Sequence, residues 1–254
     1  MFDAPLSDPT PPAGQVVSLT LNLYPRRTAW QGMAHMGTDH LHLRRLSGLQ
    51  FYRLLGTGRG SDLTLGADLR RWARFAVWSS PEALKQFEDS AWRTRERART
   101  VRSTTLVLRP ERWHGQWGGV NPFEGPQAPS RAAGPGGPVA VLTRAAIRPG
   151  KLVPFWRAVP AAQRRLSSQA GLVFALGIGE VPLLYQATFS LWDSTEAMQA
   201  FAYGGQQHRE VIARTRREGW YREELFARFT VLDVLGEGGL PGFLESHRES
   251  ETGR

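Results

Sequence analysis

His208 is the residue whose type and setting most favour chemistry, because its imidazole is expected to point into the protein. On a helix it shares a face with Phe201, Gly204 and Ile212, so that face is apolar. A buried imidazole needs a partner, either a metal or a hydrogen-bond acceptor. A histidine beside the Gly204-Gly205 pair fits an axial haem ligand, whereas a backbone carbonyl as partner would make it an ordinary core residue.

A second group of potential ligands lies on the first expected helix, where His35, Asp39 and His42 stand at positions i, i+4 and i+7. Two imidazoles and a carboxylate could hold non-haem iron. The apolar residues of that helix cluster on its other side: Trp30, Met33, Gly37 and Leu41. We expect the apolar side to pack inward and the three polar residues to face solvent, which makes a metal site there the weaker hypothesis.

Composition limits the classes of site. The 254 residues contain no cysteine, which excludes thiolate metal sites, disulfides and cysteine nucleophiles. No basic start precedes an apolar run and no run is long enough to span a bilayer, so a soluble, cytoplasmic protein is expected. The formal charge of +9 includes an arginine-rich run at 93–99 that could attract nucleic acid or anionic lipid, although a solvated helix face is the simpler interpretation.

The elements that must position His208 belong to the second half of an internal duplication. Residues 75–87 align with residues 189–201 at a constant offset of 114, with six of thirteen positions identical, so the two segments are copies. Gly48-Leu49 and Gly171-Leu172 mark a second match upstream. The chain therefore divides into parts with these bounds: a tail (1–14), a first half (15–112), a Gly/Pro-rich linker (113–138), a second half with the haem site (139–235) and a flexible tail (236–254).

Each half is predicted to run strand, helix, strand, strand, helix, strand. In the first half these elements span 15–24, 27–46, 48–57, 71–79, 81–99 and 101–109. In the second half they span 139–147, 150–166, 171–179, 183–192, 194–217 and 223–233. The order is that of a ferredoxin-like, split βαβ unit with one bare sheet face. Two such faces can cover each other, so the predicted fold class is α+β, a fused dimeric α+β barrel.

Differences between the halves point to a binding site in the second. Thr94 of the first half corresponds to His208. On the second strand of each half, Tyr52 and Leu54 correspond to the smaller residues Ala175 and Gly177, and Gly56 corresponds to Gly179. An empty void beside His208 would be costly, so a flat, apolar ligand such as haem is expected to fill it, in contact with these three residues and Gly204.

Four runs of sequence carry a resemblance to a known family: 48–58, 142–147, 177–184 and 220–232. They resemble the spheroidene monooxygenase family of acyclic carotenoid ketolases, within the dimeric α+β barrel superfamily, and the resemblance spans roughly residues 16 to 235. It implies a monooxygenase with haem b that oxidises an allylic methylene of an acyclic carotenoid to hydroxyl or ketone. It further implies dioxygen and an electron donor such as ferredoxin as co-reactants.

With that resemblance, His208 is the expected iron ligand, and Arg144 and Gln186 are candidates for the opposite side of the haem. The substrate would be an apolar polyene, and the basic surface could hold the protein at an anionic membrane. Three alternatives stay open: a cofactor-independent monooxygenase, a haem-binding protein of the same fold, and a different substrate. The last follows from the histidine-rich run 33–42, which departs from the family. Nucleic-acid binding through the arginine-rich helices is the least favoured interpretation.

Overall fold

The computed structural model describes residues 14–58, 66–123, 137–180, 185–203, 215 and 217–236. The strands are β1 (Val16–Leu23), β2 (Leu49–Gly58), β3 (Ala67–Trp78), β4 (Arg102–Gly115), β5 (Val139–Ile147), β6 (Leu172–Gly179), β7 (Tyr185–Trp192) and β8 (Tyr221–Leu235). The α-helices are α1 (Ala29–Thr38), α2 (His40–Leu43), α3 (Pro81–Glu88), α4 (Ala91–Ala98), α5 (Leu152–Ser167) and α6 (Thr195–Tyr203). Two 3-10 turns, η1 (Arg26–Thr28) and η2 (Pro149–Lys151), lead into α1 and α5.

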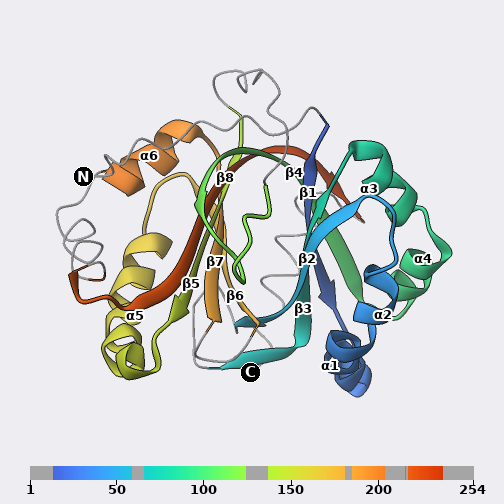
Figure 1. Ribbon diagram of the computed structural model, residues 1–254, viewed down its shortest axis with the longest axis horizontal. Helices are drawn as coiled ribbons and strands as arrows, with labels where there is room; N and C mark the ends of the chain where they lie inside the picture. The colour runs from blue at the N-terminus through green and yellow to red at the C-terminus, as the bar shows by residue number, and fades with distance from the viewer. Residues whose placement is uncertain are drawn as a thin grey trace.

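The strands form one closed antiparallel barrel in the order β1-β3-β2-β6-β7-β5-β8-β4. Both halves use the same pairing: Val16 of β1 lies opposite Trp78 of β3, and Val139 of β5 lies opposite Trp192 of β7. Figure 1 shows the barrel at the centre, with α1 to α4 on one side and α5 and α6 on the other. The predicted α+β barrel of two duplicated units is confirmed.

Strand alternation separates a barrel core from an outer face under the helices. The inward residues are apolar and almost fully buried, including Leu19, Phe75, Leu142, Phe189 and Phe229. The outward residues of the same strands meet the helices. A single residue step along a strand therefore moves a side chain from the barrel core to the outer face.

Two seams join the halves, and they are unequal. β4 and β8 pair over a long register, from Thr105 opposite Leu235 to Gly115 opposite Leu225. β2 and β6 pair only at Gly56 opposite Gly179 and Thr57 opposite Ile178. The barrel is therefore closed by extended pairing on one side and by a short contact on the other.

Most predicted elements match, with differences that have local causes. The helix predicted at 81–99 is divided at Asp89, because Ser90 caps a second helix by accepting a hydrogen bond from the Arg93 backbone N–H at 3.2 Å. The helix predicted at 27–46 likewise divides into α1 and α2. The strand predicted at 101–109 continues to Gly115, which brings Trp113 into the core. No helix among the described residues is long and apolar enough to traverse a bilayer.

The predicted orientation of the first helix is wrong. Trp30 and Leu41 are 63% and 70% exposed, whereas Asp39 is buried. The outer sheet face of the first half is itself polar there, with Arg74 buried beneath the helices, so the polar side of α1 packs inward. Gly32 allows close approach, since an added Cβ would lie 2.2 Å from the Trp72 ring.

Candidate functional site

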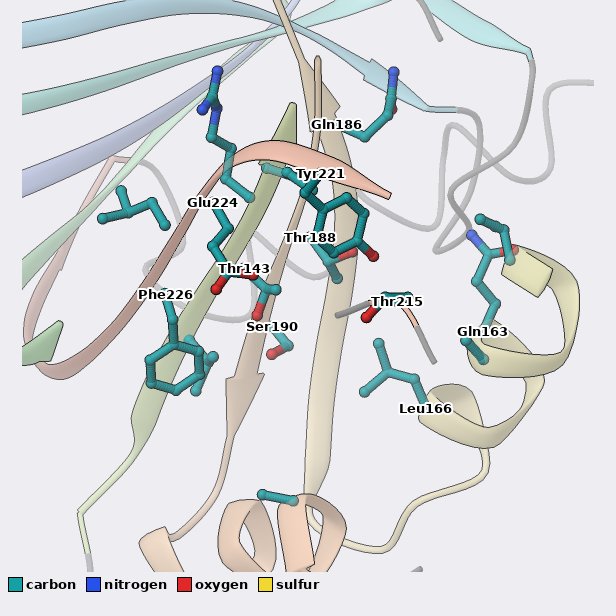
Figure 2. Close-up of a pocket in the computed structure, with 18 of the residues that line it drawn as sticks. Thr143, Gln163, Leu166, Gln186, Thr188, Ser190, Thr215, Tyr221, Glu224 and Phe226 are labelled. Atoms are coloured by element: carbon teal, nitrogen blue, oxygen red, sulfur yellow. The ribbon is translucent and has the colours of Figure 1, made fainter. Parts of the chain in front are cut away.

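A cavity of about 350 Å³ lies in the second half, between the outer face of the sheet and helices α5 and α6 (Figure 2). Its lining comes from β4, β5, β7, β8, both helices and Thr215, and is mostly apolar. Its principal apolar residues are Val141, Phe155, Val159, Leu166, Trp192, Met198, Phe201 and Phe226. The volume is within the range of about 300–1,000 Å³ that is typical of small-molecule and cofactor sites.

Helix α5 supplies one wall through residues that share its inner side. Phe155, Val159 and Leu166 are spaced four and seven residues apart, which places them on successive turns of one face. Phe155 and Val159 are buried, whereas Arg157 and Arg164 on the other side are exposed. The amphipathic pattern of this helix therefore builds an apolar wall facing the sheet.

The strands oppose this wall with small polar residues. Thr143 of β5 and Thr188 and Ser190 of β7 point into the same space as Gln163 of α5 (Figure 2). The Ser190 hydroxyl accepts a hydrogen bond from Trp192 Nε1 at 3.0 Å. The Gln163 Nε2 atom is buried and has no hydrogen-bond partner within the described part of the chain. An amide donor of this kind is available to a ligand in the cavity.

The β8 side adds groups that can hold a proton. Burial, and then the nearby Glu224 carboxylate, raise the pKa of Tyr221 to about 12, against the effect of a hydrogen bond with Thr215. The Tyr221 phenol is therefore protonated at neutral pH. From β4, His114 also lines the cavity, with its ring stacked on that of Phe226 at a centroid distance of 5.6 Å.

The predicted ligand, His208, and its neighbour Gly204 lie outside the described residues. The described residues on both sides of that segment do reach the cavity: Phe201 and Ala202 before it, and Thr215 after it, all belong to the lining. The wall of the cavity thus includes both ends of the segment that carries His208.

Gln186 and Arg144, the two residues predicted for the opposite side of the haem, both line the cavity but have different surroundings. Figure 2 shows Gln186 at the edge of the cavity, beyond Thr188. The Arg144 guanidinium is bound by the Glu223 carboxylate and lies 3.5 Å from Glu180 Oε2. Its charge is therefore already compensated by protein carboxylates.

Glu223 is held as an anion by several groups. Burial disfavours its charge, but the backbone N–H groups of Gly118 and Gly119 and the Arg144 guanidinium lower the pKa of Glu223. The two N–H groups donate to its oxygens at 2.9 and 2.6 Å. This cluster fastens the turn after β4 to β5 and β8.

The three predicted glycine and alanine positions of β6 are not in the cavity lining. Helix α5 packs against this strand, and Ala175 and Gly177 are buried beneath it. Gly179 also lies outside the lining, but it is close to a lining residue: an added Cβ would lie 3.4 Å from Gln186 Nε2. The structure thus brings Gly179 and Gln186 together, while the open space lies over β5, β7 and β8.

The sequence interpretation missed several lining residues: Thr143, Gln163, Thr188, Tyr221, Glu224 and His114. One signal was available. At the constant offset of the duplication, Arg74 corresponds to Thr188 and Trp72 to Gln186, so two large residues become smaller ones directly beside the aligned segment. This loss of bulk marks the cavity more directly than the change on β6.

The histidine-rich helix does not assemble a metal site. His35 Nδ1 lies 2.7 Å from Asp39 Oδ1, whereas the ring of His42 stacks on Trp92 at 4.8 Å. The described part of the chain contains no group of three or more His, Cys, Asp or Glu side chains arranged to hold a metal ion.

The barrel fold is shared with a solved structure of low sequence identity. A crystal structure of aldoxime dehydratase in complex with butyraldoxime matches 89% of this chain and 82% of its own, with a TM-score of 0.59 and 13% sequence identity. The structural match shows a common fold, and at this sequence identity it does not show a common activity. The class defined at this level is a duplicated α+β barrel with a cavity on the outer face of one half.

Sequence comparison identifies the family. Spheroidene monooxygenase of Rhodobacter capsulatus is 39% identical over 74% of this chain and 78% of its own length. Its counterpart in Cereibacter sphaeroides is 34% identical over 81% of this chain and 63% of its own length. No family model matches the sequence. The chain belongs to the spheroidene monooxygenase family, and it is a monooxygenase.

Proposed function

We propose that this protein is a haem-dependent monooxygenase that oxidises an allylic methylene of an acyclic carotenoid to the hydroxyl or the ketone. The names of its relatives supply the substrate class. The observation that carries the proposal for this chain is the apolar cavity whose wall includes both ends of the segment bearing His208. A polyene and a porphyrin both require such an apolar site.

The residues present fit haem in three respects. The volume of the cavity is within the range of cofactor sites, most of its lining surface is apolar, and a buried amide donor at Gln163 has no partner among the described residues. The lining holds no cysteine, since the chain has none, so a histidine is the natural axial ligand. His208 is our proposed ligand. When bound, haem b would supply an iron that activates dioxygen.

The protein's own residues would then control access and orientation. The apolar side chains of α5 and α6 exclude water from the cavity and hold the polyene by dispersion and burial. Gln163 Nε2 offers a hydrogen bond to a polar group bound there, and the protonated Tyr221 phenol offers another. The small side chains of Thr143 and Thr188 leave the space that the ligands need.

The overall reaction requires reducing equivalents. In each round one oxygen atom of dioxygen enters a C–H bond and the other leaves as water, with two electrons and two protons supplied from outside. A one-electron carrier such as ferredoxin, acting twice, is the proposed donor. A second round at the same carbon gives a gem-diol, which loses water to form the ketone.

The first test is the absorption spectrum of the full-length protein, as isolated and after titration with haemin. We expect a Soret band in the wild type and its loss or a large shift in His208→Ala. The matched control is His114→Ala, which removes an imidazole that lines the same cavity. A Soret band that depends on His114 instead of His208 would overturn the ligand assignment. A wild type that does not bind haemin would favour a cofactor-independent monooxygenase.

A further inference from the structure

Helices α1 and α2 present three large apolar side chains to solvent. Trp30, Met33 and Leu41 are 63%, 61% and 70% exposed. Gly37 lies between them, and an added Cβ there would meet nothing within 4 Å. The spacing of these four residues follows the turns of a helix, so they form one continuous apolar stripe. Figure 1 shows α1 and α2 on the outside of the first half, away from α5 and α6.

This stripe is not the side of α1 that packs on the sheet. The opposite side of α1 is already packed on the sheet, with Gly32 against Trp72 and Asp39 buried. Large apolar side chains grouped on the surface of a folded protein mark a site of interaction, whereas isolated ones do not. The stripe is therefore a candidate interaction surface.

Arginine pairs border the stripe at both ends. Arg26 and Arg27 precede α1, Arg44 and Arg45 follow α2, and all four are exposed. From residue 26 to residue 58 the sequence has a single acidic residue, Asp39, which is buried and bound to His35. The helical face thus combines apolar and cationic groups with no exposed carboxylate of its own.

We propose that this stripe and its arginine pairs dock the protein on the surface of an anionic lipid bilayer. An amphipathic helix that lies in the membrane interface has this composition, with Trp and Leu in the acyl boundary and arginines at the phosphates. A second copy of the chain fits less well. In a two-fold contact the same patch meets itself, which would bring arginine pairs together without a carboxylate to separate them.

The second half provides an internal comparison. Its corresponding helix, α5, has one large exposed apolar residue, Val153, followed by exposed Arg157 and Arg164. A single exposed valine is ordinary for a soluble surface. Val153 therefore serves as the matched control position for the stripe.

The test is co-sedimentation of the full-length protein with vesicles of phosphatidylcholine alone or mixed with phosphatidylglycerol. We expect binding to the mixed vesicles only, weakened by salt. Trp30→Ser with Leu41→Ser should reduce the affinity at least tenfold, because two large apolar side chains would no longer be transferred from water to the acyl boundary. Replacing Arg27 or Arg44 with serine should reduce it about fivefold, from roughly 1 kcal/mol per basic residue. Val153→Ser should bind as the wild type does.

A second readout locates the contact. Because the chain has no cysteine, Met33→Cys provides a unique thiol for an environment-sensitive fluorophore, with Val153→Cys as control. Blue-shifted emission at position 33 alone, on anionic vesicles, is the expected result. Equal affinity for both lipid mixtures, or a stable dimer in which position 33 is protected without lipid, would overturn the proposal. Both assays measure lipid binding without turnover, so their outcome is independent of haem and of the carotenoid.

Discussion

The two halves of the barrel share a backbone plan but use the space between sheet and helices differently. In the first half this space is filled by buried, charged side chains. In the second half the equivalent space is the cavity of about 350 Å³ (Figure 2). One fold can therefore hold either a stabilising layer or a cavity in this space by a change of side chains, with the strand pairing kept.

The filled layer of the first half is a network of charges. Arg74 donates to both oxygens of Glu96 at 2.7 and 3.1 Å, and Arg93 Nη1 donates to Glu96 at 2.6 Å. Arg93 also binds Glu88 at 3.0 Å, and Asn22 donates to Glu96 at 2.9 Å. All five side chains are buried. We refer to these five residues as the charge network.

The corresponding positions of the second half are small. Aligning β3 with β7 and β1 with β5 places Thr188 at the position of Arg74 and Ala145 at that of Asn22. The duplication offset places Ala202 at the position of Glu88. Three members of the network are thus replaced by residues that cannot reach one another, and all three replacements line the cavity.

Breaking the charge network should have the largest effect on stability. Glu96→Leu leaves Arg74 and Arg93 buried side by side without their shared carboxylate, which should lower the free energy of unfolding by about 3–5 kcal/mol. Urea unfolding followed by circular dichroism measures this change. The control Lys85→Ala removes an exposed helical ion pair with Asp89 and should cost less than about 1 kcal/mol. Equal effects of both variants would contradict the role of the network.

Acid should weaken the first half through the same residue. Burial opposes ionisation of Glu96, but Arg74 and Arg93 outweigh it and lower its pKa to about 2. Since the folded pKa lies below the unfolded value of about 4.5, this stabilisation is complete above that value and is lost as the pH falls toward 2. Between pH about 5 and 3, the unfolding free energy of the wild type should fall more steeply than that of Glu96→Leu. Parallel curves would show that Glu96 does not carry this dependence.

Filling the cavity should separate binding from folding. Thr188→Phe places an aromatic ring where the first half has Arg74, and it should weaken haemin binding at least tenfold while changing the unfolding free energy by less than about 1.5 kcal/mol. Thr188→Val is the control, because it removes the hydroxyl but keeps the volume. Haemin titration and urea unfolding of both variants are the measurements. Unchanged binding in Thr188→Phe would place the haem elsewhere.

Sequence periodicity and internal repetition were sufficient to predict the barrel fold. The offset between the copies and the strand alternation predicted the order of elements along each half. The two copies also share a helix N-cap, since Ser194 accepts from the Ala197 backbone N–H at 3.2 Å as Ser80 does from Ala83. These signals are local, since a cap or an alternating strand needs only near neighbours. The closure of two such units into a barrel followed from the need to cover both bare faces.

The details of the outer faces were harder to predict because they depend on partners distant in sequence. Helix α1 was expected to bury Trp30 and Met33, but the charge network makes its sheet face polar, so His35 and Asp39 turn inward. The arginine-rich run at 93–99 was interpreted as a solvated face, which holds for the exposed Arg95 and Arg99, whereas Arg93 and Glu96 are buried. In each case the chemistry of the opposing surface decided which side of the helix was buried.

The unequal seams of the barrel have a consequence for its motion. Separating β2 from β6 breaks a pairing of two residues on each strand, at Gly56 and Thr57 opposite Gly179 and Ile178. Separating β4 from β8 would break a ladder along most of both strands. Local opening follows the lower energy, so we expect it to begin at the short seam between β2 and β6. Because β2 also pairs with β3, we expect only the amide that β2 directs toward β6 to exchange with solvent before the amides that β4 directs toward β8.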